Sequence, residues 1–208
     1  MDKSDFKTRC RSLYTSKDRS SRVLVPPMTF ILLDGKGNPD DGKRGVIPAL
    51  ALLFAVTYAM KIRKKDSILP NDYSGYAVPP LGTLWWLAEE VRMDDPAFKE
   101  KFCWTTMIRQ PDSVTPEVFA WACHDVEREM LPDADTSRED VLDRGLGVQC
   151  LHIGAYEDME TTIEKITRFL KENNPGNALS GVRRHHEIYI SIIGRTRISN
   201  LKTGIGYQ

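Results

Sequence analysis

The chain lacks an excess of charge of either sign. Its 208 residues carry 29 Lys and Arg against 29 Asp and Glu, so the formal net charge is zero. A protein that binds nucleic acid needs a basic excess or a basic stripe to neutralise phosphates. The flat balance therefore argues against direct binding of nucleic acid. With 41% hydrophobic and 28% charged residues, the composition is ordinary for a soluble globular protein.

Cysteine clusters and targeting segments are also absent. The four cysteines, Cys10, Cys103, Cys123 and Cys150, form no CxxC pair. Cys150 and His152 stand two residues apart, but zinc would need a second close pair of ligands, so core packing is the better interpretation. We expect no metal site and no cofactor. The charged N-terminus has no apolar segment typical of a secretory signal, which together with reduced thiols predicts a cytoplasmic protein.

One hydrophobic run is long enough to raise the question of a membrane anchor. Val46 to Met60 are free of charge over fifteen positions, which is short of the ~20 residues that span a bilayer. Lys61 and Arg63 follow, where cations suit the C-terminus of a helix. The run therefore predicts a buried helix and no membrane association. Whether part of it forms a dimer contact stays open.

The order of elements repeats. Strand, helix, strand and strand are predicted first over 23–33, 46–63, 73–78 and 102–109, and again over 146–153, 158–171, 184–193 and 200–207. An extra helix opens at Thr115-Pro116-Glu117, and the polar stretch 131–144 reads as a connector. Two such units predict an α+β fold with an antiparallel sheet, helices on one face and a ligand pocket on the other. We expect one domain over 1–208, with unit one at about 22–111, a linking helix and connector at 112–144, and unit two at about 145–208.

The strand that begins at His185 is the most informative segment. Ile188, with the isoleucines that follow it, points to one face and is expected to pack on the helices, whereas His185, Glu187 and Tyr189 point to the other. A partly enclosed Glu187 suits either a lipophilic cation held between aromatic walls or a general base. The alternative is a solvent-facing strand whose Glu187 pairs with Arg183 or Arg184.

Several motifs, taken in order, resemble those of the GyrI-like small-molecule-binding domain in its stand-alone form. They are MTFILLDGKGNPDD, YAVPPLGTLWWLA, WTTMIRQPDSVTPEVFAWA, VQCLHIGAYEDMETTIEKITRFL, RRHHEIYIS and NLKT, and they extend from about residue 5 to the C-terminus. The resemblance implies a pseudo-twofold pair of units with a pocket between them. Drug-sensing relatives bind bulky aromatic compounds, often cations, through a glutamate that corresponds to Glu187. Some stand-alone relatives are hydrolases that open the cyclopropane ring of DNA-alkylating compounds, and Glu187 matches their glutamate too.

The resemblance also directs attention to aromatic residues. Trp85, Tyr156 and Trp104 match positions that line the relatives' pocket, although adjacent Trp85 and Trp86 cannot both face it in an extended segment. The predicted ligand-binding residues are Glu187, Tyr189, Trp85, Trp104, Tyr76, Met107, His185 and Tyr156, and the predicted catalytic residues are Glu187 and Tyr156. The chain departs from its relatives at Gly82-Thr83, where a second acid is missing, and in its tail after the key strand. Neither departure affects Glu187.

Three functions from different classes follow. The first is a binding module for a lipophilic, aromatic and often cationic small molecule, which we favour narrowly because no second catalytic group is evident. The second is a hydrolase of strained or electrophilic rings, such as cyclopropane-bearing genotoxins, with Glu187 as general base; no Gly-x-Ser-x-Gly motif supports acyl hydrolysis. The third is an interaction protein with a protein partner or a homodimer. Detoxification would fit either of the first two.

Overall fold

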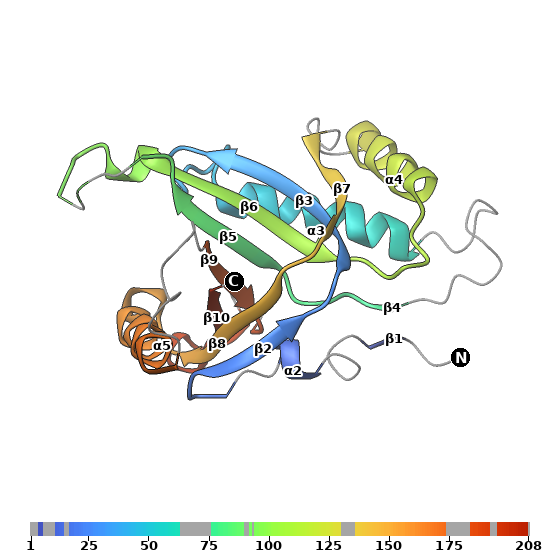
Figure 1. Cartoon of the computed structure of the whole chain (residues 1–208). Coiled ribbons are helices and arrows are strands. Elements are labelled where there is room, and N and C mark those ends of the chain that lie inside the picture. The colour runs from blue at the N-terminus through green and yellow to red at the C-terminus, as the bar shows by residue number, and fades with distance from the viewer. Residues whose placement is uncertain are drawn as a thin grey trace.

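The structure is a computed structural model that describes residues 4–5, 11–14, 17–62, 76–89, 92, 94–129, 136–173, 184–191 and 195–207. Its largest sheet contains β2 (Ser21–Val25), β3 (Met28–Lys36), β5 (Gly82–Leu87), β6 (Phe102–Arg109), β7 (Arg138–Leu142), β8 (Gly145–Ile153), β9 (His185–Tyr189) and β10 (Lys202–Tyr207). A short parallel pair is formed by β1 (Ser4–Asp5) and β4 (Tyr76–Ala77). The α-helices are α2 (Arg11–Tyr14), α3 (Val46–Ile62), α4 (Pro116–Glu129) and α5 (Glu160–Asn173), and the 3-10 turns are η1 (Phe98–Lys101), η3 (Tyr156–Asp158) and η4 (Ile198–Asn200). The predicted α+β class is confirmed (Figure 1).

The order of strands in the sheet shows the internal repeat. The order is β2-β8-β10-β9-β5-β6-β3-β7, and its pairs are antiparallel. The two passes are β3-α3-β5-β6 and β8-α5-β9-β10. The strand predicted over 73–78 for the first pass is wrong: within it the structure describes only β4, which pairs with β1, and β5 takes its place in the large sheet. Their middle strands, β5 and β9, pair at the centre, and the order outward is the same on both sides. This is the predicted pseudo-twofold arrangement, whereas the exact domain bounds stay a prediction.

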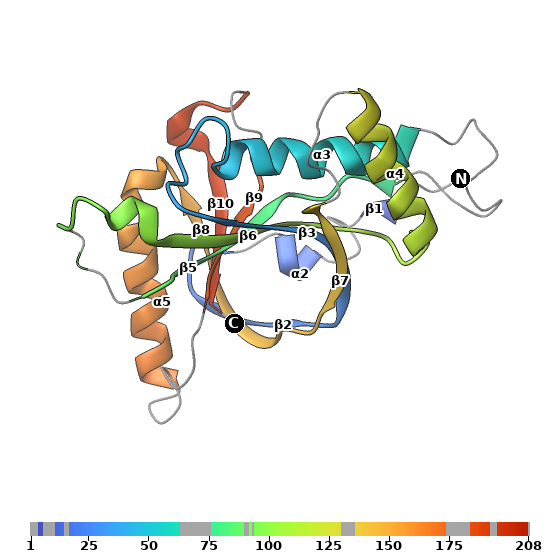
Figure 2. The same cartoon turned by 90° about the horizontal axis from the view of Figure 1, so that it is seen from above.

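The sheet is curled. β2 and β3 follow each other in the chain with only Pro26 and Pro27 between them, yet they lie at or near opposite ends of the strand order. The sheet must therefore bend until its two ends approach each other, and Figure 2 shows this curl with α2 inside it. Val23–Leu33 was predicted as one strand. The two prolines split it because proline has no N–H to donate to a ladder.

The helices α3 and α5 cover the same face of the sheet from its two halves. In a paired register, residues directly opposite each other point to the same face. One such row runs Trp104, Trp85, His185, Tyr207 and Val148 across five strands. At one end, Trp104 packs against residues of α3, and at the other, Val148 packs against residues of α5. We refer to this as the helix face and to the inside of the curl as the concave face.

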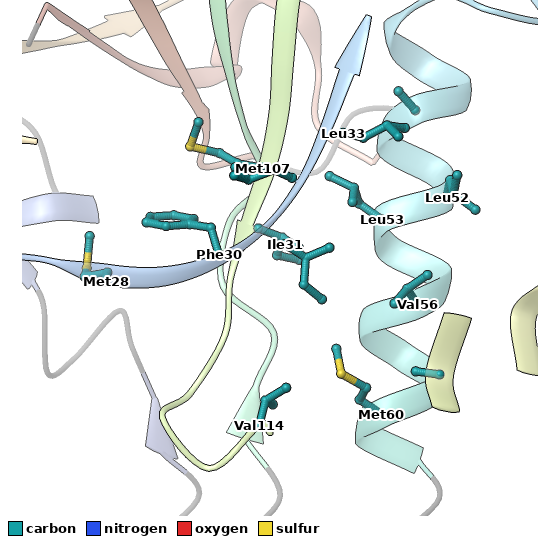
Figure 3. Close-up of a cluster of buried hydrophobic side chains, with 14 of the residues drawn as sticks. Met28, Phe30, Ile31, Leu33, Leu52, Leu53, Val56, Met60, Met107 and Val114 are labelled. Atoms are coloured by element: carbon teal, nitrogen blue, oxygen red, sulfur yellow. The ribbon is translucent and has the colours of Figure 1, made fainter. Parts of the chain in front are cut away.

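The main core lies on both sides of β3. Figure 3 shows Ile31 and Leu33 on the side of β3 that faces α3, with Phe30 and Met107 on the opposite side. Ile31 is completely buried, as are Leu53 and Val56 of α3. The 15-residue apolar run therefore forms the predicted helix, which is buried on the side that faces β3, whereas Ile47 and Phe54 are exposed. Among the described residues, no helix is both long and apolar enough to cross a membrane.

The predicted connector 131–144 contains a strand. β7 pairs with the first half of β3 and forms one edge of the sheet. Most of its side chains are exposed or half-buried. An edge strand that buries neither face has no alternation of polar and apolar residues, so the sequence pattern could not reveal it.

Candidate functional site

Glu187 stands at the centre of the helix face. The row of side chains that contains it runs Thr106, Thr83, Glu187, Ile205 and Cys150, from the half covered by α3 to the half covered by α5. The pseudo-twofold axis of the strand order lies beside it, where β5 and β9 meet. The carboxylate is therefore held between the two repeats by the middle strand of the second one.

The two sides of β9 are arranged differently from the sequence expectation. Ile188 was expected on the helices, but its partner Gly82 and the neighbouring Met107 place it on the concave face. Glu187 shares the helix face instead. The alternation along the strand is as predicted. The face predicted to meet the helices is wrong, because α3 and α5 lie on the face of Glu187, each over its own half of the sheet.

The Glu187 carboxylate accepts two hydrogen bonds from its own strand. His185 Nε2 lies 3.0 Å from Oε1, and the Tyr189 hydroxyl donates to Oε2 over 3.1 Å. An ionised carboxylate only accepts, so Nε2 is the donor of this bond, and Nδ1 on the other side of the ring is hydrogen-bonded to the Tyr207 hydroxyl at 3.0 Å. The Glu187 side chain is 14% exposed. The alternative of a solvent-facing Glu187 paired with Arg184 is therefore wrong, and Arg183 lies outside the described residues.

Three tyrosines surround this carboxylate and stay protonated at neutral pH. Burial, and then the charge of Glu187, raise the pKa of Tyr156 and of Tyr207. The same two causes raise the pKa of Tyr189 well above its usual value. The rings of Tyr156 and Tyr189 meet edge to face, with centroids 6.3 Å apart. Phenol groups that keep their protons beside an anion act as hydrogen-bond donors.

The tryptophans divide between the two faces as extended backbone requires. Trp85 lies on the helix face, with its ring centroid 6.1 Å from that of Trp104. Trp86 lies on the opposite face, where the Arg184 guanidinium stands 4.1 Å above its ring. The prediction of Trp85 for the Glu187 side is correct in position. The indole N–H groups of Trp85 and Trp104 are buried without a hydrogen-bond partner.

A cavity adjoins the aromatic group. Its volume is about 330 Å³, and Trp104 forms part of its wall together with Gly35, Pro48 and Leu52. Trp104 also packs in one cluster with Trp85 and Tyr189. Among the described residues, Trp104 is thus the one that the cavity shares with the group around Glu187, and the cavity wall also carries the cations Lys43 and Arg44.

Two predicted site residues lie elsewhere. Tyr76 is fully buried, and its hydroxyl donates to Gln110 over 2.7 Å in the core. Met107 lies on the concave face, since its partner Gly82 is opposite Ile188. The structure thus brings Glu187 together with His185, Tyr189, Trp85, Trp104 and Tyr156, but not with Tyr76 or Met107.

Sequence reasoning missed Tyr207. It reaches the site because β10 pairs with β9 and places Tyr207 opposite His185. A strand over 200–207 was predicted, but Tyr207 was not assigned to the site. The alternation of Thr203, Ile205 and Tyr207 in KTGIGY was the available signal.

Cys150 and His152 do not form a metal site. Cys150 is fully buried under α5. Both ring nitrogens of His152 are hydrogen-bonded, to Thr162 at 3.0 Å and to the Ala155 carbonyl at 2.8 Å. Within the described part of the chain, no group of three His, Cys, Asp or Glu side chains is placed to hold a metal ion.

Comparison with solved structures shows where the fold recurs. The chain is 31% identical to an uncharacterized conserved protein from Listeria innocua, with a TM-score of 0.86 and 99% of each chain covered. It is also 31% identical to a hydrolase from Listeria innocua, with a TM-score of 0.81 and coverage of 99% of this chain and 98% of that one. The C-terminal domain of EcmrR, at 10% identity and a TM-score of 0.52, covers 91% of this chain and 95% of its own, and shares the fold.

No curated protein matches the chain. The sequence profile of the GyrI-like small molecule binding domain matches residues 21–206, which is nearly the whole chain and includes both repeats and Glu187. The chain therefore belongs to the family of GyrI-like small molecule binding domains.

Proposed function

We propose that this protein binds lipophilic aromatic cations on the helix face, with Glu187 as the counter-charge. The aromatic walls are supplied by Trp85, Trp104, Tyr156 and Tyr189. The proposal rests on one observation above the others. Glu187 is largely enclosed and receives hydrogen bonds from an imidazole and a phenol, while no Lys or Arg of the described residues pairs with it.

An enclosed anion among aromatic rings favours a cationic ligand for two reasons. The negative faces of the rings attract a cation, with about 2 kcal/mol for each desolvated contact. The carboxylate adds a charge that is only weakly screened because little water reaches it. Together these contributions predict dissociation constants in the micromolar range, on the order of −8 kcal/mol in binding free energy.

Two xanthene dyes of similar shape and opposite charge test the proposal. Rhodamine 6G is a cation and fluorescein is an anion at neutral pH. We expect saturable quenching of tryptophan fluorescence by rhodamine 6G and little quenching by fluorescein. In Glu187→Gln, affinity for rhodamine 6G should fall roughly 10- to 100-fold, as expected when a hydrogen-bonded charge is lost.

Glu157→Gln is the matched control. Glu157 is exposed in η3, next to Tyr156, so the same substitution removes a charge near the site without entering it. It should leave the affinity within about twofold, since exposed charges are screened. Equal binding of both dyes, or an unchanged affinity in Glu187→Gln, would contradict the proposal.

A second candidate, a hydrolase of strained rings, is favoured by the similarity to a hydrolase from Listeria innocua. Glu187 would take a proton from water, and the resulting hydroxyl would bond to the strained ring carbon as the ring C–C bond breaks. The electron pair of that bond would pass to the conjugated carbonyl oxygen, which would take a proton from the Tyr156 phenol. The phenol would regain that proton from Glu187 through solvent.

Mass spectrometry separates the two candidates. A cyclopropane-bearing indole alkylator is incubated with the wild type and with Glu187→Gln. A gain of one water in the wild type alone would identify a hydrolase. Unchanged compound that co-purifies with the protein would identify a binder. Equal rates in both proteins would remove Glu187 from the reaction.

A further inference from the structure

The concave face has a small pocket of its own, separated from Glu187 by the thickness of the sheet. It lies inside the curl, where residues of α2, β2, β3, β5, β6, β8 and β9 line it, and its volume is about 40 Å³. That is room for about three water-sized groups. Its wall includes the apolar side chains Met28, Phe30, Met107 and Ile188 and the polar side chains Arg144 and His186.

Arg144 is the unusual member of this wall. Its Nη1 atom is buried without a hydrogen-bond partner. No carboxylate of the described residues pairs with its guanidinium. Burial, and then the nearby charge of Arg184, lower the pKa of Arg144 to about 10. An arginine has donors and no acceptor, so a buried Nη1 without a partner is an unmet requirement for an acceptor, which an anion meets best.

His186 does not meet that requirement. It is 8% exposed, and burial followed by the charge of Arg144 lowers its pKa well below the usual value. The ring is neutral at pH 7 and adds no negative charge. The wall also includes the polar side chains of Tyr14 and Gln149, which are uncharged, so its charged member is Arg144, with a second cation, Arg184, close enough to influence it.

We propose that this pocket is an anion site that takes the carboxylate group of a short-chain aliphatic acid. The planar carboxylate matches the fork of the guanidinium, which can donate two parallel hydrogen bonds to it. The methyl or ethyl group would lie against Phe30 and Ile188. A phosphate fits less well because an apolar wall leaves most of its oxygens without donors.

This site is independent of the proposed function at Glu187. The two lie on opposite faces of β9 and share no side chain. Binding of an aliphatic acid should be the same in Glu187→Gln as in the wild type. Failure of one proposal therefore leaves the other standing.

Isothermal titration with acetate and propionate, each compared with its neutral amide, tests the site. We expect acetate and propionate to bind and acetamide and propionamide not to bind. In Arg144→Gln, carboxylate affinity should fall roughly 10- to 100-fold, because a hydrogen bond between two charges is lost. Arg197→Gln removes the same charge from an exposed position outside the pocket and should leave affinity unchanged.

Three outcomes would overturn the proposal. They are equal binding of the acids and their amides, no binding of either to the wild type, and equal losses in Arg144→Gln and Arg197→Gln. Thermal unfolding without carboxylate is a further check. Arg144→Gln should unfold at the same temperature as the wild type or higher, because it removes a buried charge without a partner. A large fall would mean that the guanidinium is satisfied within the chain, which also overturns the proposal.

Discussion

Two unlike polar groups lie on the opposite sides of β9, one from β9 itself and one from the residue that precedes β8. On the helix face, the Glu187 carboxylate is surrounded by an imidazole and three phenols and receives two hydrogen bonds. On the concave face, the Arg144 guanidinium lies beside a neutral His186 and has no anion among the described residues. The anion on the helix face has hydrogen-bond donors within the chain, whereas the cation on the concave face has a buried donor atom, Nη1, without an acceptor.

The difference comes from what each charged group needs. A carboxylate only accepts, and neutral His and Tyr side chains can donate to it without bringing a second charge into the interior. A guanidinium only donates, and the wall around Arg144 contains neutral groups but no carboxylate among the described residues, while its buried Nη1 has no acceptor. The helix face can therefore hold its charge in the free protein, whereas the concave face gains most from an anionic ligand. The predictions that follow disturb one face at a time.

The largest effect is expected from a substitution at Gly35 of β3, on the helix face. Gly35 lies opposite Trp104, and a Cβ added to it would stand 2.2 Å from the indole. Trp104 is 1% exposed and cannot move freely, so Gly35→Ala should lower the free energy of unfolding by about 1–3 kcal/mol. Urea unfolding measures the loss. Rhodamine 6G binding should weaken with it, while acetate binding on the concave face persists.

Gly42→Ala is the control for Gly35→Ala. A Cβ at Gly42 meets nothing within 4 Å, so the free energy of unfolding should change by less than about 0.5 kcal/mol. Similar losses in the two variants would show that backbone freedom, and not contact with Trp104, decides the effect at Gly35.

The helix face was the more predictable of the two. Alternation in HHEIY placed His185, Glu187 and Tyr189 together, and the strand Phe102–Arg109 was predicted with the observed bounds. Such patterns are local, so one sequence suffices to read them. Which face of the sheet the helices cover depends on contacts between segments that are distant in sequence. The face on which Ile188 lies was therefore predicted wrongly.

The concave face could not be predicted because its parts are distant in sequence. Arg144 precedes β8 in a stretch that read as a polar connector, and it meets His186 only because the sheet curls. The curl itself depends on the break at Pro26 and Pro27 and on the pairing of β2 with β8. None of these features produces a periodic pattern of polar and apolar residues around Arg144 from which the pocket could be predicted.

The next largest expected effect is a dependence of the free energy of unfolding on pH, caused by His186 on the concave face. Burial and the charge of Arg144 lower the pKa of His186 in the folded protein, whereas the unfolded chain should titrate near 6.5. The unfolded state binds the extra proton below that pH. The stability contribution is therefore present above about pH 6.5 and is lost as the pH falls below it, by up to about 1.4 kcal/mol per pH unit.

Urea unfolding between pH 5 and 8 in a buffer free of carboxylates measures this dependence. His186→Gln should lose less stability on acidification than the wild type. His124→Gln should follow the wild type because His124 is exposed on α4. If His186→Gln and the wild type have the same slope, then His186 is not kept neutral by its surroundings.

The smallest effect is expected at Tyr207, which acts on Glu187 only through His185. Tyr207→Phe removes the hydroxyl that is hydrogen-bonded to His185 Nδ1 but keeps the ring and the hydrogen bond between Nε2 and Glu187. A neutral hydrogen bond contributes about 1 kcal/mol, so we expect that loss in the free energy of unfolding and a two- to fivefold loss in affinity for rhodamine 6G. Tyr58→Phe, on α3, is the control and should change neither. A loss in Tyr207→Phe as large as that in Glu187→Gln would mean that the ligand contacts the Tyr207 hydroxyl directly. The site would then extend along the whole row from Trp85 to Tyr207, and the chain's unusual tail would be part of what selects the ligand.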